Sequence, residues 1–197
     1  MILDLLNVKY FLIPNVLTID SKDTQKVFSG DCAVYENKDY LPRAFIVPDY
    51  EVIEYPKGVI ITLESEDFDP REKVILMTNP VETQRAASLS RAKPLYNVDF
   101  LKYEQNNISL KVQTNRAGFL VLGNNLNNNW KVKINNKEAT HYQANLVQRA
   151  VYLSAPGVYK IEFYYFPKLF LMGLAITLSA ILILILLYFL QRQNLRP

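Results

Sequence analysis

The feature that most constrains this chain is an uncharged run of 22 residues near its C-terminal end, at positions 169–190. A helix of that length rises about 33 Å, and the apolar core of a bilayer is about 30 Å thick. The alternative is a helix buried in a large soluble core, but a chain of 197 residues with one such segment has too small a core to cover it. The sequence therefore predicts a transmembrane helix at residues 167–191, followed by a short tail at 192–197.

The residues that flank this run indicate how the helix lies in a membrane. Phe166 and Tyr188 stand where aromatic rings favour the interface, and Lys168 can extend its ammonium group to the headgroups. Arg192 and Arg196 follow the helix, while Lys168 alone precedes it. Because basic residues mark the cytoplasmic side, we expect a cytoplasmic C-terminus and a soluble part outside the cytoplasm.

Charge and cysteine content narrow the function classes. Two of the 22 basic residues lie in the tail. The part of the chain before the tail therefore has 20 basic and 19 acidic residues, and its net charge is close to zero. Such a balance excludes the basic face that nucleic-acid binding requires. The single cysteine, Cys32, excludes an internal disulfide and is predicted to be a small buried side chain.

The first residues leave two architectures open. The stretch at residues 1–14 has no basic leader region and no small-residue cleavage site, so it is not a signal peptide. Its apolar part is too short to span a bilayer. Either the chain is the C-terminal piece of a longer membrane protein whose earlier part carried it across, or it is a tail-anchored protein with a cytoplasmic domain.

The first half of the chain mixes strand and helix signals. Apolar runs rich in β-branched and aromatic residues predict strands at residues 7–13, 33–36, 44–47 and 74–77. A helix is predicted within residues 50–66, although the β-branched run at 59–62 argues for a strand. Asp69-Pro70 predicts a turn, and the polar stretch at 79–94 predicts a linker. We expect a small α/β subdomain at residues 1–94.

In the second half of the chain, apolar and polar residues alternate as in strands of a sheet with one buried and one solvent-exposed face. Apolar residues alternate with polar ones around positions 108–112, 130–134 and 161–165, and Asn135-Asn136 predicts a hairpin turn. We expect a jelly-roll-like β-sandwich at residues 95–166. The fold class is thus α+β and mostly β, ending in one transmembrane helix. The predicted core between the sheets contains Trp130, Phe119, Ile161 and Phe163.

Several sequence blocks, taken in order, resemble a known family. They are LDLLNVKYFL, ENKDYLPRAFIV, EDFDPREKVIL, GFLVLGNNLNNNWKVKINNKEA and NLVQRAVYLSAPGVYKIEFYYFPKLFLMG, followed by the apolar helix. This order resembles the C-terminal extracytoplasmic part of YfhO-type bacterial integral membrane proteins, which are similar to GT-C glycosyltransferases. The chain departs from the family at Asn128-Asn129, where Pro-Gly is usual, and at Asn135-Asn136, where Asp-Gly is usual.

The resemblance implies an accessory role. In GT-C enzymes the catalytic acid lies in an early loop between membrane helices, and the resemblance covers only the later part of such a protein. It implies that this chain is the accessory domain and last helix of a cell-envelope glycosyltransferase that uses a lipid-linked sugar. The chain alone is then expected to have no catalytic residues and to bind no cofactor.

An asparagine-rich loop is the candidate carbohydrate-binding site, because amides both donate and accept hydrogen bonds. Its alternative is an ordinary polar turn. Trp130 beside it is either a sugar-stacking platform or, as its alternation with Val132 and Ile134 favours, a core residue. The candidate sugar-binding residues are Asn124, Asn125, Asn127, Asn128 and Asn129.

Two other groups of ionisable residues are weaker candidates for a functional site. Glu66, Asp67 and Asp69 offer acid–base or cation-binding carboxylates, but they are better interpreted as part of a capped turn. One histidine, His141, and one cysteine do not make a zinc site, so no metal is expected.

The expected partners are the lipid bilayer, the upstream membrane-spanning region of the same protein, and a glycan or lipid-linked sugar. Nucleic acid is not among them. The competing hypothesis is a non-enzymatic, tail-anchored structural or protein-interaction module.

Overall fold

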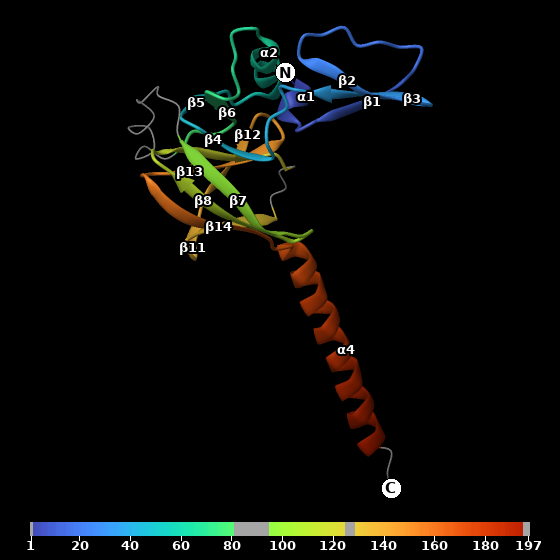
Figure 1. Ribbon diagram of the computed structural model, residues 1–197. Helices are drawn as coiled ribbons and strands as arrows, with labels where there is room; N and C mark the ends of the chain where they lie inside the picture. Colours follow the sequence, from blue (N-terminus) through green and yellow to red (C-terminus); the bar gives the residue numbers. More distant parts are fainter. Residues whose placement is uncertain (1, 81–94, 125–128, 195–197) are drawn as a thin grey trace.

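The computed structural model describes residues 2–80, 95–124 and 129–194, and it is mostly β, as predicted. In these residues the strands form three sheets, and one long helix, α4 (Lys168–Asn194), extends away from the β-rich part (Figure 1). Two of the sheets make up the sandwich. The third, formed by the first strands of the chain, lies at the opposite end of the molecule from α4 (Figure 1).

The first sandwich sheet has five strands in the order β11-β10-β14-β8-β7, and every neighbouring pair is antiparallel. The strands are β7 (Tyr96–Tyr103), β8 (Asn107–Thr114), β10 (Trp130–Ile134), β11 (Lys137–Ala139) and β14 (Gly157–Tyr165). Asn135 and Asn136 both have positive φ, 50° and 65°, between the paired residues Ile134 and Lys137. The predicted hairpin turn is therefore confirmed.

The second sandwich sheet has six strands in the order β4-β9-β13-β12-β6-β5. The strands are β4 (Ala44–Val47), β5 (Asp49–Val52), β6 (Lys73–Leu76), β9 (Gly118–Leu122), β12 (His141–Ala144) and β13 (Gln148–Leu153). β4 pairs with β9 and β6 with β12, so the sheet takes strands from both sides of residue 94. The division of the chain into folding units at that residue stays a prediction.

The helix predicted at residues 50–66 is wrong in its first part. Residues 49–52 form β5, which pairs in parallel with β6, and α2 (Pro56–Glu64) connects the two strands. Pro56 fits the first turn of α2, where its missing N–H costs no helical hydrogen bond. Two parallel neighbouring strands need a crossover connection such as α2. The pattern of apolar and polar residues along the sequence does not show which strands are connected in this way.

Two apolar cores lie on the two faces of the six-stranded sheet. Leu120 and Leu122 of β9 face the five-stranded sheet, together with Trp130, Ile161 and Phe163. Phe119 and Val121 of β9 face the other way and pack with Val59 and Leu63 of α2. Trp130 keeps only 8 % of its surface exposed and Ile161 and Phe163 are fully buried between the sheets, as predicted. Phe119 is also fully buried, but its predicted place between the sheets is wrong, because alternation along β9 turns it toward α2.

The third sheet has the order β1-β3-β2, from β1 (Tyr10–Pro14), β2 (Thr24–Ser29) and β3 (Cys32–Asn37). The short helix α1 (Ile2–Leu5) precedes it. Cys32 is only half-buried here, so its predicted burial is wrong. The reason is its place at the first residue of β3, opposite the exposed Pro14.

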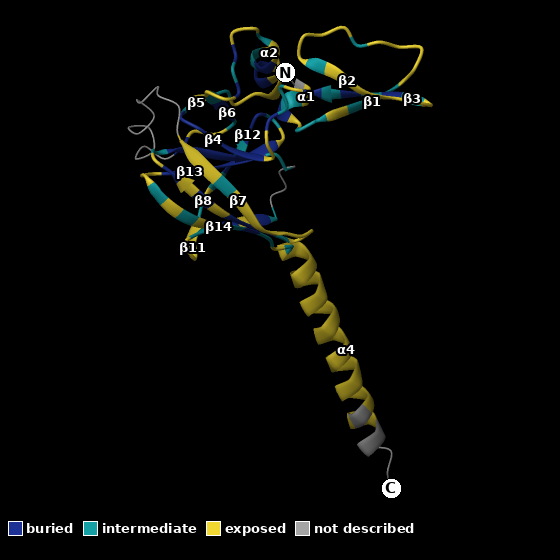
Figure 2. Ribbon diagram, in the orientation of Figure 1, coloured by how far each residue is buried: buried dark blue, intermediate teal, exposed yellow. Residues whose placement is uncertain are grey.

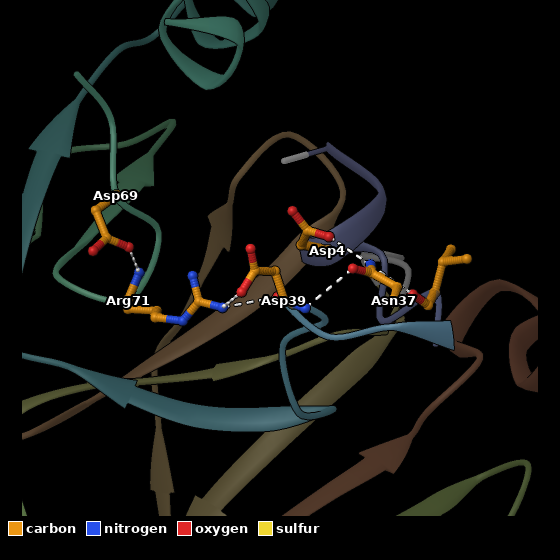
Figure 3. A network of polar contacts seen from close by, with 6 residues as sticks. Asp4, Asn37, Asp39, Asp69 and Arg71 are labelled. Carbon is orange, nitrogen blue, oxygen red and sulfur yellow. Dashed lines mark hydrogen bonds and ion pairs between the residues drawn. The ribbon is translucent and has the colours of Figure 1, made fainter. Parts of the chain in front are cut away.

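A series of polar contacts connects α1 and the third sheet to the sandwich (Figure 3). Asn37 donates to Asp4 over 2.6 Å, and the Asp39 N–H donates to Asn37 over 3.1 Å. Arg71 donates its guanidinium to the Asp39 carbonyl, and its own N–H donates to Asp69 Oδ1, both over 2.8 Å. Asp69 thus acts as the predicted turn residue.

The helix α4 has the properties of a membrane span. Its Lys168–Tyr188 segment is long and apolar enough to cross a bilayer, and none of that segment is buried against the rest of the protein (Figure 2). The hydroxyls of Thr177 and Ser179 donate to the carbonyls of Gly173 and Ala175, one helical turn earlier. Polar groups are satisfied within the helix in this way because lipid offers them no partner.

Candidate functional site

The candidate site follows the asparagine loop, from Asn129 near the start of α4 to Asn124 on the side of α1. The Phe166 N–H, two residues before α4, donates to the Asn129 carbonyl over 2.7 Å. The Tyr165 N–H donates to the Asn106 carbonyl, in the turn between β7 and β8, over 2.9 Å. These bonds hold the end of the asparagine loop and the β7–β8 turn against the start of the membrane helix.

Two residues of the predicted site are described, and each is hydrogen-bonded to a tyrosine. Asn124 Oδ1 accepts from the Tyr103 hydroxyl over 3.2 Å. Asn129 Nδ2 donates to the Tyr165 hydroxyl over 3.2 Å. The remaining predicted residues, Asn125, Asn127 and Asn128, lie outside the described residues. Both ends of the loop therefore reach the five-stranded sheet through side-chain amides.

Sequence reasoning missed Arg43, which completes this group. Its Nη1 donates to the Tyr103 hydroxyl over 2.9 Å, and its guanidinium carbon lies 5.1 Å from the centre of the Tyr103 ring. Arg43 precedes β4 and Tyr103 ends β7, so the pair joins the ends of the two sheets. Neither residue stands out in the sequence, because 60 positions separate them.

Trp130 lies beneath this surface as a core residue. The Arg149 guanidinium stacks 4.1 Å from its ring, and the Tyr165 ring meets it edge-on at 5.7 Å. Arg149 itself is almost fully buried, and burial lowers the pKa of its guanidinium to about 10. The stacking-platform alternative for Trp130 does not fit, because both neighbours cover the ring.

A cavity of about 300 Å³ opens next to Asn124. Its apolar wall comes from α1 and the residue after it, Leu5 and Leu6, with Val147. Its polar wall is Asn124 and the buried Gln148, whose Nε2 donates to the Leu5 carbonyl over 2.6 Å. An amide and an apolar wall side by side suit a small polar molecule that also has an apolar face, as a sugar ring does.

The other sequence candidates show no ligand-binding geometry. His141 is half-buried, and burial, aided by Arg149 and Lys131, lowers the pKa of its imidazole. In the described parts of the chain no group of three or more His, Cys, Asp or Glu side chains is gathered as a metal site would need.

The sandwich and the helix together define a membrane protein with a β-rich domain on one side of the bilayer. A family model described as "Bacterial membrane protein YfhO" matches residues 78–177, half of the chain, and the chain belongs to this family. The matched region contains the five-stranded sheet, the asparagine loop and the first turns of α4. No curated protein and no solved structure matches the chain.

Proposed function

We propose that this chain is the extracytoplasmic accessory domain and last membrane helix of a cell-envelope glycosyltransferase that uses a lipid-linked sugar. In this proposal the asparagine loop binds the sugar, and catalysis belongs to the upstream membrane region of the same protein. The observation that carries it is the hydrogen bond between Phe166 and Asn129, because it holds the end of an asparagine-rich loop next to the residues that lead into the membrane helix.

The height of the loop matches the chemistry of the substrate. A lipid-linked sugar has its lipid in the bilayer and its phosphate and sugar at headgroup level. Asn129 is bonded to a residue two positions before the membrane helix, so the loop end lies at that level. Arg43 would supply a guanidinium for the phosphate, since planar guanidinium groups match phosphate oxygens.

Membership of the YfhO family and the membrane helix support the membrane part of this proposal. The cavity beside Asn124 supports the sugar-binding part, because its amide and apolar walls would contact the two kinds of surface that a sugar ring presents.

The test is a binding measurement on the full chain in lipid nanodiscs. The ligand is a polyprenyl-phosphate sugar, and the variants are Asn124→Ala and, as a matched control, Asn97→Ala. Asn97 is exposed, whereas Asn124 is half-buried, and Asn97 lies at the far end of β7. Loss of one hydrogen bond of about 0.5–1.5 kcal/mol should weaken binding by about 2- to 10-fold for Asn124→Ala only.

Equal affinity of both variants, or no measurable binding, would contradict the proposal. The second result would favour the alternative of a protein-interaction module. One observation supports that alternative: Leu12 and Phe28 of the third sheet are exposed on the face that also contains Val34.

A further inference from the structure

The edge strand β7 exposes large apolar side chains in a way that a soluble sandwich avoids. β7 is the last strand of the five-stranded sheet, and most of its residues are exposed (Figure 2). Leu101 keeps 57 % of its surface exposed, and the rings of Phe100 and Tyr103 are also exposed. Edge strands of soluble proteins usually replace such residues with charges or prolines, because an apolar edge invites aggregation.

This apolar part of β7 is close to the start of α4. The turn after β7 is bonded to Tyr165, three residues before Lys168, and the figure shows the β7–β8 end beside the top of the helix (Figure 1). Leu101 lies three residues before Glu104, in that turn, or about 10 Å along a strand at 3.3 Å per residue. Phe166, between β14 and α4, is exposed at the same end.

We propose that residues 100–103 of β7, together with Phe166, lie in the interfacial layer of the bilayer and hold the sandwich against the membrane. The occupant of this surface is lipid, at the boundary between headgroups and acyl chains. Interfacial segments insert about 5–10 Å, which matches the reach of Leu101 from the turn. Aromatic rings favour this layer because one side of it is apolar and the other is wet.

The charges on this strand indicate which lipids it fits. Asp99, Lys102 and Glu104 sum to −1, and Lys102 pairs with Glu104 over 3.0 Å. With Arg43 on Tyr103 and Lys168 at the start of α4 the local sum is +1, far from the clusters of four or more basic residues that recognise anionic headgroups. The contact should therefore depend on apolar insertion and should not need anionic lipid.

Continuity with α4 favours lipid over a second protein. The exposed apolar residues continue through Phe166 into Leu169 and Phe170 at the start of α4. The opposite end of β7 also exposes apolar side chains, those of Tyr96 and the preceding Leu95, but these line an open cavity of about 500 Å³ together with the polar Asn97 and are not continuous with α4. A protein partner that added a strand to β7 would cover both ends of it, whereas a membrane would cover only the end near α4.

The experiment compares nitroxide labels at the two ends of β7. In a Cys32→Ala background, Leu101→Cys and Asn97→Cys are labelled, since both native side chains are exposed and their replacement leaves the core intact. The full chain is placed in phosphatidylcholine nanodiscs, with and without phosphatidylglycerol. Collision with oxygen, which concentrates in lipid, is compared with collision with a water-soluble nickel chelate.

We expect the oxygen-to-nickel collision ratio to be several-fold higher at residue 101 than at residue 97, in both lipid mixtures. Equal ratios with full nickel access at both positions would overturn the proposal. Equal protection at both positions would also overturn it, because that pattern indicates a protein partner along the whole edge. So would a high ratio at residue 101 that required phosphatidylglycerol. Circular dichroism of each labelled variant checks that the sheet is intact.

Discussion

Arg149 and Trp130 form a cation–π stack in which each side chain buries the other. A guanidinium is more weakly hydrated than an ammonium group and stacks on aromatic faces, so it is the cation that tolerates this position. The Phe163 ring lies 5.7 Å from the same guanidinium. The stack lies directly behind the candidate site, and it fixes the first residue of β10, where the asparagine loop ends.

Replacing Trp130 by alanine should destabilise the fold by about 3–5 kcal/mol, the usual range for removing a large buried aromatic side chain. The loss combines apolar burial with the Arg149 and Tyr165 contacts. It is measured as the free energy of unfolding in denaturant, followed by circular dichroism. Trp130→Phe is the control and should lose less, because it keeps a ring in the cavity.

A Trp130→Ala protein of unchanged stability that no longer bound a lipid-linked sugar would contradict this prediction. It would show that the indole is a binding platform and not part of the core.

Side-chain neighbours across the sheets were the part of the site that the sequence could not reveal. Arg149 stands within QRAVYL, where a charged residue in a strand would be expected to face water. It points inward because both faces of β13 are covered. Asn124 and Asn129 were predictable from composition alone, whereas Arg43 and Tyr103 join them only through the strand order.

At the scale of elements, alternation predicted the strands that have one wet face. β10 and β14 follow it, and both begin or end close to the predicted positions. The sequence did not predict β9 and β13, because all their residues are buried and neither strand has an alternating pattern. β9 is a continuous apolar run, and β13 mixes polar and apolar residues. The covering layer on their second face, α2 and α1, comes from a distant part of the sequence.

The β10–β11 hairpin offers a test of backbone conformation. Asn136 has φ of 65°, a conformation that costs most L-residues about 1–2 kcal/mol but that asparagine tolerates. Asn136→Ala should therefore destabilise the fold by about 1 kcal/mol, while Asn136→Gly should not. The free energies of unfolding of the two variants are compared, and Asn135 is left in place because its Oδ1 accepts from the Lys160 N–H.

Equal stability of Asn136→Ala and Asn136→Gly would mean that the turn does not need a positive φ at this residue, contrary to the structure.

For the whole molecule, the fold class and the membrane helix followed from the sequence because long apolar runs and strict alternation are local signals. The pairing of β4 with β9 and the βαβ unit of β5, α2 and β6 did not, because these contacts join residues that are distant along the chain. The predicted tail at 192–197 lies partly within α4, which continues through Asn194.

The side of the membrane occupied by the sandwich is a prediction at this scale. Arg192 and Arg196 after α4 favour a cytoplasmic C-terminus. A cysteine introduced as Asn124→Cys in the Cys32→Ala background, with the protein in its full natural context, should react with a membrane-impermeant maleimide in intact cells. Reaction only after lysis would place the sandwich in the cytoplasm.

The strand order also determines when the protein can fold. β14 is the last strand along the chain, yet it lies in the middle of its sheet, between β10 and β8. During synthesis, β10 and β11 can pair as a hairpin, and so can β7 and β8, but these two halves have no common edge until Tyr165 has left the ribosome. Because α4 begins three residues later, closure of the sheet and entry of the helix into the bilayer become nearly simultaneous events in the life of the nascent chain.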